Sequence, residues 1–288
     1  VMRRGGVVGE ADMPVPAAEL VTMMFGEPVE IAARPEAVMG DTVLSLRDVT
    51  IEERLMHIEG ISLEVAAGEV IGIAGMEGSG QSTFLRGISG LIRPSAGSIM
   101  LDGEDVTHAG YRARLGSGIH YLPAGRLEEG LVEGLTITEH LVLAERTDRG
   151  FFVDWDKARK RAEARIAEYS IKGTAASTVE GLSGGNQQRL LLAMLPPDLK
   201  VLLMEHPTRG LDLGSADWVW TQLLARRDHG TAIVFASADI DELLRYSDRI
   251  VVFFSGQVLA VLEASATDVD ESGHLIGGRV SRTASGSA

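Results

Sequence analysis

The chain has 288 residues, a formal net charge of −14, and 45% hydrophobic and 24% charged residues. This composition is typical of an ordinary globular protein rather than a fibrous or wholly disordered one. The acidic balance argues against a broad surface for nucleic acid or anionic lipid. The absence of cysteine from the sequence excludes disulfides, thiol catalysis and cysteine-bound metal. No apolar run approaches the roughly 20 residues that cross a bilayer, so we expect any membrane role to act through a partner.

The two ends of the chain differ from its middle. Residues 27–42 carry two prolines and little periodicity, which is typical of a linker. Segments within residues 1–26 resemble segments about 250 residues further along, as expected for the tail of an earlier copy, although chance similarity between short Gly/Val segments explains the echo equally well. The pairs are Val7-Val8-Gly9 with Val258-Leu259-Ala260, and Met24-Phe25-Gly26 with Leu275-Ile276-Gly277.

From Thr42 onward, short apolar runs alternate with helical patterns, which predicts a mainly parallel sheet covered by helices. The unbroken runs predict strands that are buried on both faces. They occupy residues 70–74, 98–101, 201–204 and 232–236. Between about residues 128 and 195 the pattern becomes helical and more charged, which predicts a helical insertion into the α/β domain.

A glycine-rich turn over residues 75–83 follows the first of these runs and reads Gly-Met-Glu-Gly-Ser-Gly-Gln-Ser-Thr. A phosphate-binding loop needs glycines so that backbone N–H groups surround the phosphates, and a helix N-terminus whose partial positive charge faces them. Gln81 stands where such loops have the lysine that reaches the β- and γ-phosphates. Taken alone, the turn fits an ordinary tight turn as well.

Further segments follow the turn in a fixed order. Residues 182–189, Leu-Ser-Gly-Gly-Asn-Gln-Gln-Arg, begin a helix whose N–H groups, with the Ser183 hydroxyl, suit a terminal phosphate. The buried strand at 201–204 leads into residues 205–212, and residues 237–242 follow another helix and strand. Unrelated turns are not expected to fall in this order.

Together these segments resemble the ATP-binding subunit of ATP-binding-cassette (ABC) transporters over about residues 43–262. Residues 75–83 look like the Walker A loop, 182–188 like the signature motif, 201–205 like Walker B and 210–212 like the D-loop. Three narrower forms are similar to the second half of the fused tandem ATPases of monosaccharide (ribose-type) and nucleoside importers. They are Gly80-Gln81-Ser82, Leu182–Gln188 and Pro207–Asp212. In those fusions the first half ends with a tail similar to residues 3–26.

The resemblance implies an α/β P-loop NTPase fold with a mainly parallel sheet core, an antiparallel β region near the N-terminus, and a helical subdomain at about residues 125–195. It implies a nucleotide-binding domain at residues 43–262, after the tail of a preceding domain at 1–26 and a linker at 27–42. Residues 263–288 are expected to form a partly disordered tail.

The implied partners are the preceding nucleotide-binding domain of the same parent chain, paired head to tail, and transmembrane permease subunits. A solute-binding protein is an indirect partner, and no nucleic acid is expected. The implied location is peripheral, on the cytoplasmic face of the plasma (inner) membrane.

ATP and Mg²⁺ are the implied ligands. We expect Ser82 to offer a hydroxyl to Mg²⁺ and Glu205 a carboxylate from outside the first coordination sphere. The remaining nucleotide contacts are expected from the phosphate loop, and the signature residues are expected to serve the nucleotide of the partner domain. These residues are Gly75, Glu77, Gly78, Ser79, Gly80, Gln81, Ser82 and Thr83 in the loop, and Ser183, Gly184, Gly185 and Gln187 in the signature.

The departures from the family pattern concern hydrolysis. Glu205 replaces the usual aspartate, His206 stands at the catalytic glutamate position, Ala238 at the switch histidine position and Ala124 at the Q-loop position. A missing general base typically costs about 10²- to 10⁴-fold in rate and a missing electrostatic donor about 10²- to 10³-fold. With Gln81 in place of lysine as well, we expect this half to be hydrolysis-impaired.

Three alternatives stay open. One is a self-sufficient P-loop ATPase that uses His206 as its base, since histidine titrates near neutral pH. The second is a non-transport cassette protein that acts on DNA or in translation, and the third is an interaction module that binds no nucleotide. No Tyr, Trp or Phe occurs between Thr42 and Glu69, so His57 is the candidate for contacting the base. Arg189 is expected on a solvated helix face.

Overall fold

The computed structural model describes residues 2–3, 6–7, 10, 38–145 and 152–267. The chain divides into two units, residues 1–36 and residues 37–288. In the first unit, β1 (Met2–Arg3) and β2 (Gly6–Val7) pair antiparallel. The rest of the predicted tail at 1–26, most of the predicted linker and the C-terminal residues 268–288 lie outside the described residues.

A six-stranded sheet forms the centre of the second unit. Its strands are β5 (Val70–Ala74), β8 (Ile119–Leu122), β9 (Val201–Glu205), β10 (Ala232–Ala236), β11 (Arg249–Phe254) and β12 (Gln257–Glu263). The order is β12-β11-β5-β10-β9-β8, and every neighbouring pair is parallel except β11 with β12. β5, β9 and β10 are buried almost throughout because both faces of the sheet pack into hydrophobic cores. The predicted mainly parallel sheet is confirmed.

A second sheet is antiparallel, as the resemblance implies. It consists of β3 (Thr42–Glu53), β4 (Met56–Ala66), β6 (Ala96–Leu101) and β7 (Glu104–Asp105), in the order β4-β3-β6-β7. One prediction is wrong here, because the run at 98–101 is a strand but is not buried on both faces. It pairs with β3, and its side chains alternate between buried and half-buried since only one face of this sheet meets the core.

Three helices fix the sheets in place. α2 (Gln81–Ser89) packs between the two sheets through Phe84, Leu85 and Ile88, each of which is fully buried. α7 (Leu213–Asp228) and α8 (Ile240–Tyr246) pack on the other face of the parallel sheet. Between them, the Trp220 ring stacks on Tyr246 with centroids 4.0 Å apart. The phosphate loop is therefore held between well-packed elements.

A buried arginine anchors the far end of α2. Arg114, in α3 (Tyr111–Ser117), is fully buried and donates hydrogen bonds to the carbonyl oxygens of Gly87 and Ile88 at 2.8 and 2.6 Å. Burial lowers the pKa of Arg114 to about 10, and Asp105 opposes this shift. A cation at a helix C-terminus interacts favourably with the helix dipole. Arg114 thus fixes the helix that begins at the phosphate loop.

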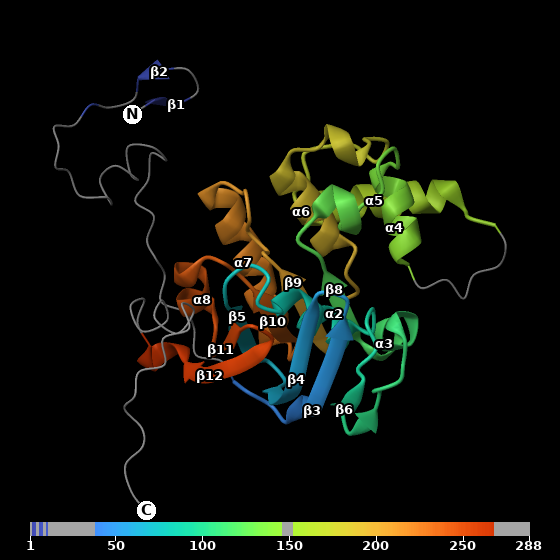
Figure 1. Ribbon diagram of the computed structural model, residues 1–288. Helices are drawn as coiled ribbons and strands as arrows, with labels where there is room; N and C mark the ends of the chain where they lie inside the picture. Colours follow the sequence, from blue (N-terminus) through green and yellow to red (C-terminus); the bar gives the residue numbers. More distant parts are fainter. Residues whose placement is uncertain (1, 4–5, 8–9, 11–37, 146–151, 268–288) are drawn as a thin grey trace, which may run out of the picture. The chain divides into compact units, whose positions relative to one another are not determined.

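The helical subdomain contains α4 (Ile137–Ala144), α5 (Trp155–Glu168) and α6 (Gly184–Ala193). Figure 1 shows these helices gathered at one end of the second unit, with β3, β4 and β6 at the other. α4 begins with a capping box, in which the Glu139 carboxylate accepts from the Thr136 backbone N–H at 2.7 Å. This bond lowers the pKa of Glu139. The predicted helical insertion is confirmed.

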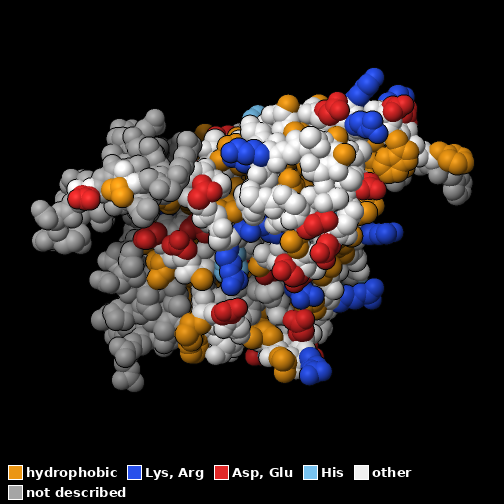
Figure 2. Space-filling view, turned by 90° about the horizontal axis from the view of Figure 1, so that it is seen from above, with side chains coloured by type: hydrophobic (Ala, Val, Ile, Leu, Met, Phe, Trp, Pro, Cys, Tyr) orange, Lys and Arg blue, Asp and Glu red, His pale blue; other side chains and the backbone are white. Residues whose placement is uncertain are grey.

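The described surface is mixed in character. Figure 2 shows Lys and Arg side chains standing among Asp, Glu and hydrophobic groups on the face that it presents. Within the part of the chain that the structure describes, no helix is both long and apolar enough to span a membrane.

Candidate nucleotide site

The phosphate loop joins β5 directly to α2. Gly78 and Gly80 have φ angles of 82° and 113°, in the left-handed region that glycine adopts without a steric penalty. Gly80 is the N-cap of α2, and no side chain of the described residues caps this helix end. Its first backbone N–H groups are therefore available to an anion. The structure thus forms the predicted strand-to-helix turn at residues 75–83, and the anion site there stays a prediction.

Gln81 folds back onto the loop. Its Nε2 donates to the carbonyl oxygen of Met76 at 3.1 Å, and a Cβ on Gly75 would lie only 2.5 Å from the same nitrogen. The amide therefore lies along the loop backbone and carries no charge. Position 81, where such loops have a lysine that contacts phosphates, thus has a neutral side chain that forms a hydrogen bond within the loop.

The two hydroxyl residues after Gln81 are oriented differently. Thr83 is buried, and its hydroxyl donates to the Glu53 carboxylate at the end of β3 over 2.8 Å. Ser82 is exposed and lines the cavity beside the loop. Ser82, the hydroxyl predicted for Mg²⁺, is therefore freer than Thr83, which was predicted to contact the nucleotide.

A cavity of about 860 Å³ opens beside the loop, beyond the carboxyl ends of β5, β9 and β10. Ligands of open α/β sheets bind at this edge. The structure brings together here most of the predicted loop residues and all five positions that depart from the family pattern, which are Gln81, Ala124, Glu205, His206 and Ala238. It does not bring the signature residues Ser183, Gly184, Gly185 and Gln187 to this cavity.

The hairpin between β3 and β4 supplies an apolar wall that the sequence reasoning missed. Leu55 and Met56 line the cavity, whereas His57, the sequence candidate for contacting a base, is not among the lining residues. The Met56 sulfur lies 3.4 Å from where a Cβ on Gly80 would stand. The apolar residues of the hairpin before the loop are the sequence signal for this wall, although neither of them is aromatic.

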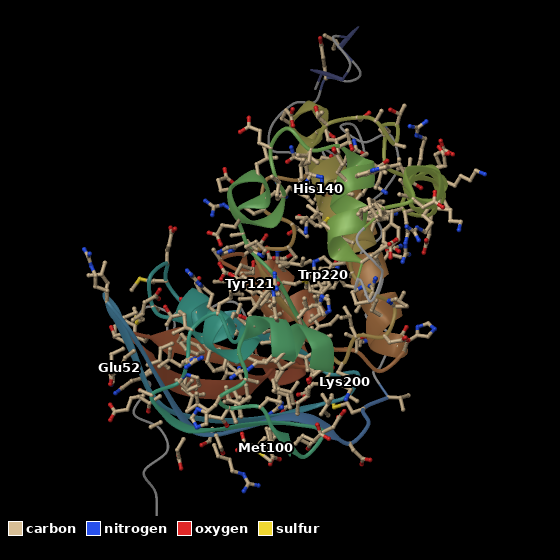
Figure 3. The ribbon with its side chains drawn as sticks, turned by 90° about the vertical axis from the view of Figure 1, so that its right-hand side faces the viewer. Glu52, Met100, Tyr121, His140, Lys200 and Trp220 are labelled. Atoms are coloured by element: carbon tan, nitrogen blue, oxygen red, sulfur yellow. The ribbon has the colours of Figure 1, made fainter. Side chains whose placement is uncertain are left out.

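Glu205 is paired with a buried tyrosine. The Tyr121 hydroxyl, from β8, donates to Glu205 Oε1 at 2.7 Å. Burial raises the pKa of Tyr121, and the bond to Glu205 raises it further, so the hydroxyl stays protonated. Figure 3 shows Tyr121 in the interior, between the helical part marked by His140 and the antiparallel sheet marked by Met100. The extra methylene of glutamate, relative to aspartate, thus meets a donor on the neighbouring strand.

A second carboxylate, Glu242, organises the loops around the cavity. It is 8% exposed and accepts from the Thr208 hydroxyl at 2.6 Å, the Trp220 indole N–H at 2.8 Å and the Ser237 hydroxyl at 2.6 Å. These donors come from the loop after β9, from α7 and from the loop after β10. Sequence patterns do not single out Glu242, because Asp239 and Glu242 have the spacing of an ordinary helix cap.

His206 and Ala238 lie at the ends of the two central strands. His206 has a φ of 47°, a left-handed conformation that ends β9, and its backbone N–H donates to the Ala236 carbonyl at 2.8 Å. Among the described residues, its imidazole has no hydrogen-bond partner that would orient it as a base. Ala238 offers no polar group.

The cavity is acidic. Among the described residues that line it, Arg209 is the single Lys or Arg. The carboxylates in the lining are those of Glu77, Glu205, Asp239 and Glu242. A triphosphate that enters therefore meets backbone N–H groups from the loop but an excess of negative side chains elsewhere, which a divalent cation would offset.

The signature segment begins α6 with Ser183 as its N-cap. The Ser183 hydroxyl accepts from the Asn186 amide at 2.8 Å. Gln187 is buried, and its Nε2 donates to the carbonyl oxygens of Val179 and Leu182 at 3.1 and 3.2 Å. Its side-chain amide thus holds the segment from the buried side. The backbone N–H groups of the first turn remain at the N-terminal end of α6.

The expectation that Arg189 lies on a solvated helix face is wrong. Its guanidinium lies 3.7 Å from the centroid of the Trp218 ring, and its Nη1 donates to the Tyr169 carbonyl at 3.0 Å. The side chain therefore joins α6 to α7. The helical pattern around Arg189 does not reveal this contact, because Trp218 is remote in sequence.

An ABC transporter family model matches residues 58–209, just over half of the chain. The chain belongs to the ABC transporter family. It is 32% identical to the nucleoside import ATP-binding protein NupA of Lactococcus lactis subsp. cremoris over 97% of this chain and 58% of that protein. It is 34% identical to the glucose import ATP-binding protein TsgD13 of Haloferax volcanii, over 94% of this chain and 51% of that protein. It is also 34% identical to the ribose import ATP-binding protein RbsA of Chromobacterium violaceum, over 92% and 53%.

This ABC chain thus spans about half the length of the curated relatives that it matches. Among solved structures, the ATP-binding cassette MJ1267 aligns with a TM-score of 0.66 and 19% identity, over 82% of this chain and 95% of that one. A dimeric ABC transporter cassette, MJ0796, aligns with a TM-score of 0.66 and 24% identity, over 77% and 98%. These likenesses establish the ABC-type fold.

Proposed function

We propose that this ABC domain is the second, hydrolysis-impaired nucleotide-binding half of a fused ATP-binding protein that serves a sugar or nucleoside importer. The names of the relatives, which are import ATP-binding proteins for nucleosides, glucose and ribose, support the solute class. Their length, about twice the matched part, supports a tandem parent. In this proposal residues 1–26 are the tail of the first half, 27–42 the linker, 43–262 the domain and 263–288 its own tail.

The observation that carries the proposal is a phosphate cup that is retained beside a cavity without its hydrolytic groups. The glycines and the uncapped start of α2 keep the backbone geometry that holds phosphates. Gln81 is tied to Met76, and Ala124 and Ala238 offer no polar side chain. In this proposal the site therefore still binds ATP but does not hydrolyse it.

Mg²⁺ fits the oxygen groups that remain. Ser82 lines the cavity with an exposed hydroxyl, and Glu205 gives one oxygen to Tyr121 while its side chain also lines the cavity. Oxygen donors of this kind suit Mg²⁺, which neutralises phosphate charge when bound. In an acidic cavity this neutralisation makes ATP binding depend steeply on the metal.

The signature segment supports a role toward a partner domain. Ser183, Gly184 and Gly185 lie outside the cavity of their own chain, so a nucleotide that they contact belongs to another domain. In a head-to-tail pair, that domain is the preceding half of the same parent. Exposed apolar side chains on the helical subdomain support docking to permease subunits at the cytoplasmic face of the membrane. These are Leu143, Phe152, Val153 and Trp155.

The test is calorimetric titration of the 288-residue chain with ATP and Mg²⁺, combined with a hydrolysis assay. We expect binding that is lost without Mg²⁺, and negligible turnover. Gln81→Lys should tighten binding by about tenfold, which corresponds to about 1.4 kcal/mol. Gln222→Lys, the same change on α7 away from the cavity, is the matched control and should leave affinity unchanged.

Two outcomes would contradict the proposal. Absence of nucleotide binding in both the wild type and Gln81→Lys would favour an interaction module. Turnover of about one per second that is lost in His206→Ala would identify a self-sufficient ATPase.

A further inference from the structure

Arg126 lies between the cavity and the helical subdomain. It begins the short π-helix η1 (Arg126–Gly130), two residues after Ala124, which lines the cavity. This segment begins four residues after the end of β8. Arg126 is therefore placed where the chain leaves the cavity wall and enters the helical part, and the sequence reasoning did not single it out.

One guanidinium contacts two other segments. Its Nε donates to Gln188 Oε1 in α6 at 2.9 Å, and its Nη2 donates to the backbone carbonyl of Arg209 in the loop after β9. Its Nη1 lies 3.3 Å from where a Cβ on Gly184 would stand. Gln188 is only 5% exposed. The side chain thus links the first turns of the signature helix to the loop at residues 206–212.

That loop forms one wall of the cavity, since His206, Thr208, Arg209 and Gly210 all line it. Two of its hydrogen bonds lead back toward the parallel sheet and α8, from the His206 N–H to Ala236 and from Thr208 to Glu242. Among the hydrogen bonds that described residues make with this loop, the one from Arg126 leads to the helical subdomain. A ligand that shifts the loop therefore acts on α6 through this side chain.

The chemistry of the contact requires arginine. Burial lowers the pKa of Arg126, and Glu128 opposes the shift, so the charge is held in a partly desolvated place. Its hydrogen-bond acceptors are neutral, a side-chain amide and a backbone carbonyl. The planar fork of arginine reaches both at once, whereas the compact ammonium of lysine does not.

We infer that Arg126 is a positioning residue that transmits nucleotide binding in the cavity to the signature helix α6. The inference rests on the proposed function, because it requires the cavity to bind nucleotide. Occupancy of this site then alters how α6 presents Ser183 and Gly184 to the nucleotide of the partner domain. The transmission does not need a polar side chain at Ala124.

Hydrogen exchange of the 288-residue chain, with and without saturating ATP and Mg²⁺, tests the inference. In the wild type, nucleotide should slow exchange at residues 75–83, at 206–212 and in α6, the last by about fivefold, the low end of ordinary coupling between sites. In Arg126→Ala, nucleotide should still slow exchange at residues 75–83 and 206–212. Exchange in α6 should be the same with and without nucleotide. Arg126→Lys should behave in the same way.

Arg189→Ala is the matched control. Arg189 also holds α6, but its ring contact and its hydrogen bond go to Trp218 and Tyr169. Among the described residues it donates no hydrogen bond to the cavity loop, and only its charge interacts with Asp212 at the end of that loop. Its loss should speed exchange in α6 without nucleotide and leave the nucleotide response unchanged. A purely structural role for Arg126 would give the same pattern as Arg189, so the two variants separate transmission from stability.

Gln188→Ala removes the other partner of the hydrogen bond with Arg126. It replaces Arg126→Ala as the test if that variant does not fold. It should abolish the response of α6, and adding Arg126→Ala should change nothing further, because the two residues share one contact. Protection at residues 75–83 with an intact α6 response in Arg126→Lys and Gln188→Ala would overturn the inference. Absence of protection at 75–83 in the wild type would instead overturn the proposed function.

Discussion

The polar side chains around the cavity and those at the start of the signature helix α6 differ in the hydrogen bonds that they make. Around the cavity, polar side chains are hydrogen-bonded within the chain: Glu242 accepts from three donors, Tyr121 donates to Glu205, and Gln81 donates to the backbone carbonyl of Met76. At the start of α6 the polar side chains point inward, as Gln187 does, and the N–H groups of the first turn stay at the helix end. The difference shows that the cavity wall is held by hydrogen bonds within the chain, which is the arrangement that the proposed loss of hydrolysis requires.

The largest effect is expected from Glu242→Ala, which removes the centre of the cavity network. The buried indole N–H of Trp220 and the hydroxyls of Thr208 and Ser237 would lose their acceptor. We expect the free energy of unfolding to fall by about 3 kcal/mol, as for several buried polar groups left unpaired. Urea unfolding measures this.

Glu242→Gln is the control, because its amide keeps one oxygen acceptor, and it should cost about half as much. A loss below about 1 kcal/mol in Glu242→Ala would mean that the donors find other acceptors. The cavity wall would then not depend on this carboxylate, and the contrast between the two regions would fail.

A smaller effect, with a distinct pH signature, is expected from Tyr121→Phe. Loss of the hydrogen bond to a carboxylate should cost about 1.5–2 kcal/mol near neutral pH. The pKa of Tyr121 is raised in the folded protein, so the unfolded chain loses this proton first, above pH about 10. Stability due to the tyrosine is therefore fully present below that pH and is lost as the pH rises above it, by about 1.4 kcal/mol per pH unit.

Unfolding measured between pH 8 and about 11 checks this, because the decline should be shallower in Tyr121→Phe. The pKa of Tyr246 is also raised, to about 12, mainly by burial, so part of the decline should persist in the variant. Equal slopes for the wild type and Tyr121→Phe would contradict a buried, protonated hydroxyl at Glu205.

The smallest effect is expected at the signature, from Gly185→Ala. A Cβ there would lie 2.9 Å from the Ser215 hydroxyl oxygen of α7, which is tighter than a normal contact. Alanine improves helix propensity by about 0.8–1 kcal/mol, and the crowding should outweigh this gain by about 0.5–1 kcal/mol. Thermal unfolding of Gly185→Ala, and of the pair with Ser215→Ala, measures the crowding.

Gly181→Ala is the matched control, since a Cβ at Gly181 meets nothing within 4 Å. Its stability should stay within about 0.5 kcal/mol of the wild type. If Gly185→Ala stabilises the protein while Gly181→Ala does not, the signature glycine is not needed for packing against α7.

Much of the fold could be predicted from local patterns in the sequence. The apolar runs at 70–74, 201–204 and 232–236 predicted buried parallel strands, because a strand between two helix layers has no polar face. The same rule failed at 98–101, where a short apolar run belongs to a sheet with one buried face. Run length does not distinguish these cases, since what covers the second face is decided by distant segments.

The sequence by itself determined the glycine-rich strand-to-helix turn at residues 75–83 and the start of α6, because the required residues are adjacent in the chain and glycine is needed where φ is positive. Only the tertiary structure decided what surrounds them. Tyr121 meets Glu205 across 84 positions, Arg126 meets Gln188 across 62, and Thr208 meets Glu242 across 34. Such partners are set by which strands and helices become neighbours, and no local pattern encodes that choice.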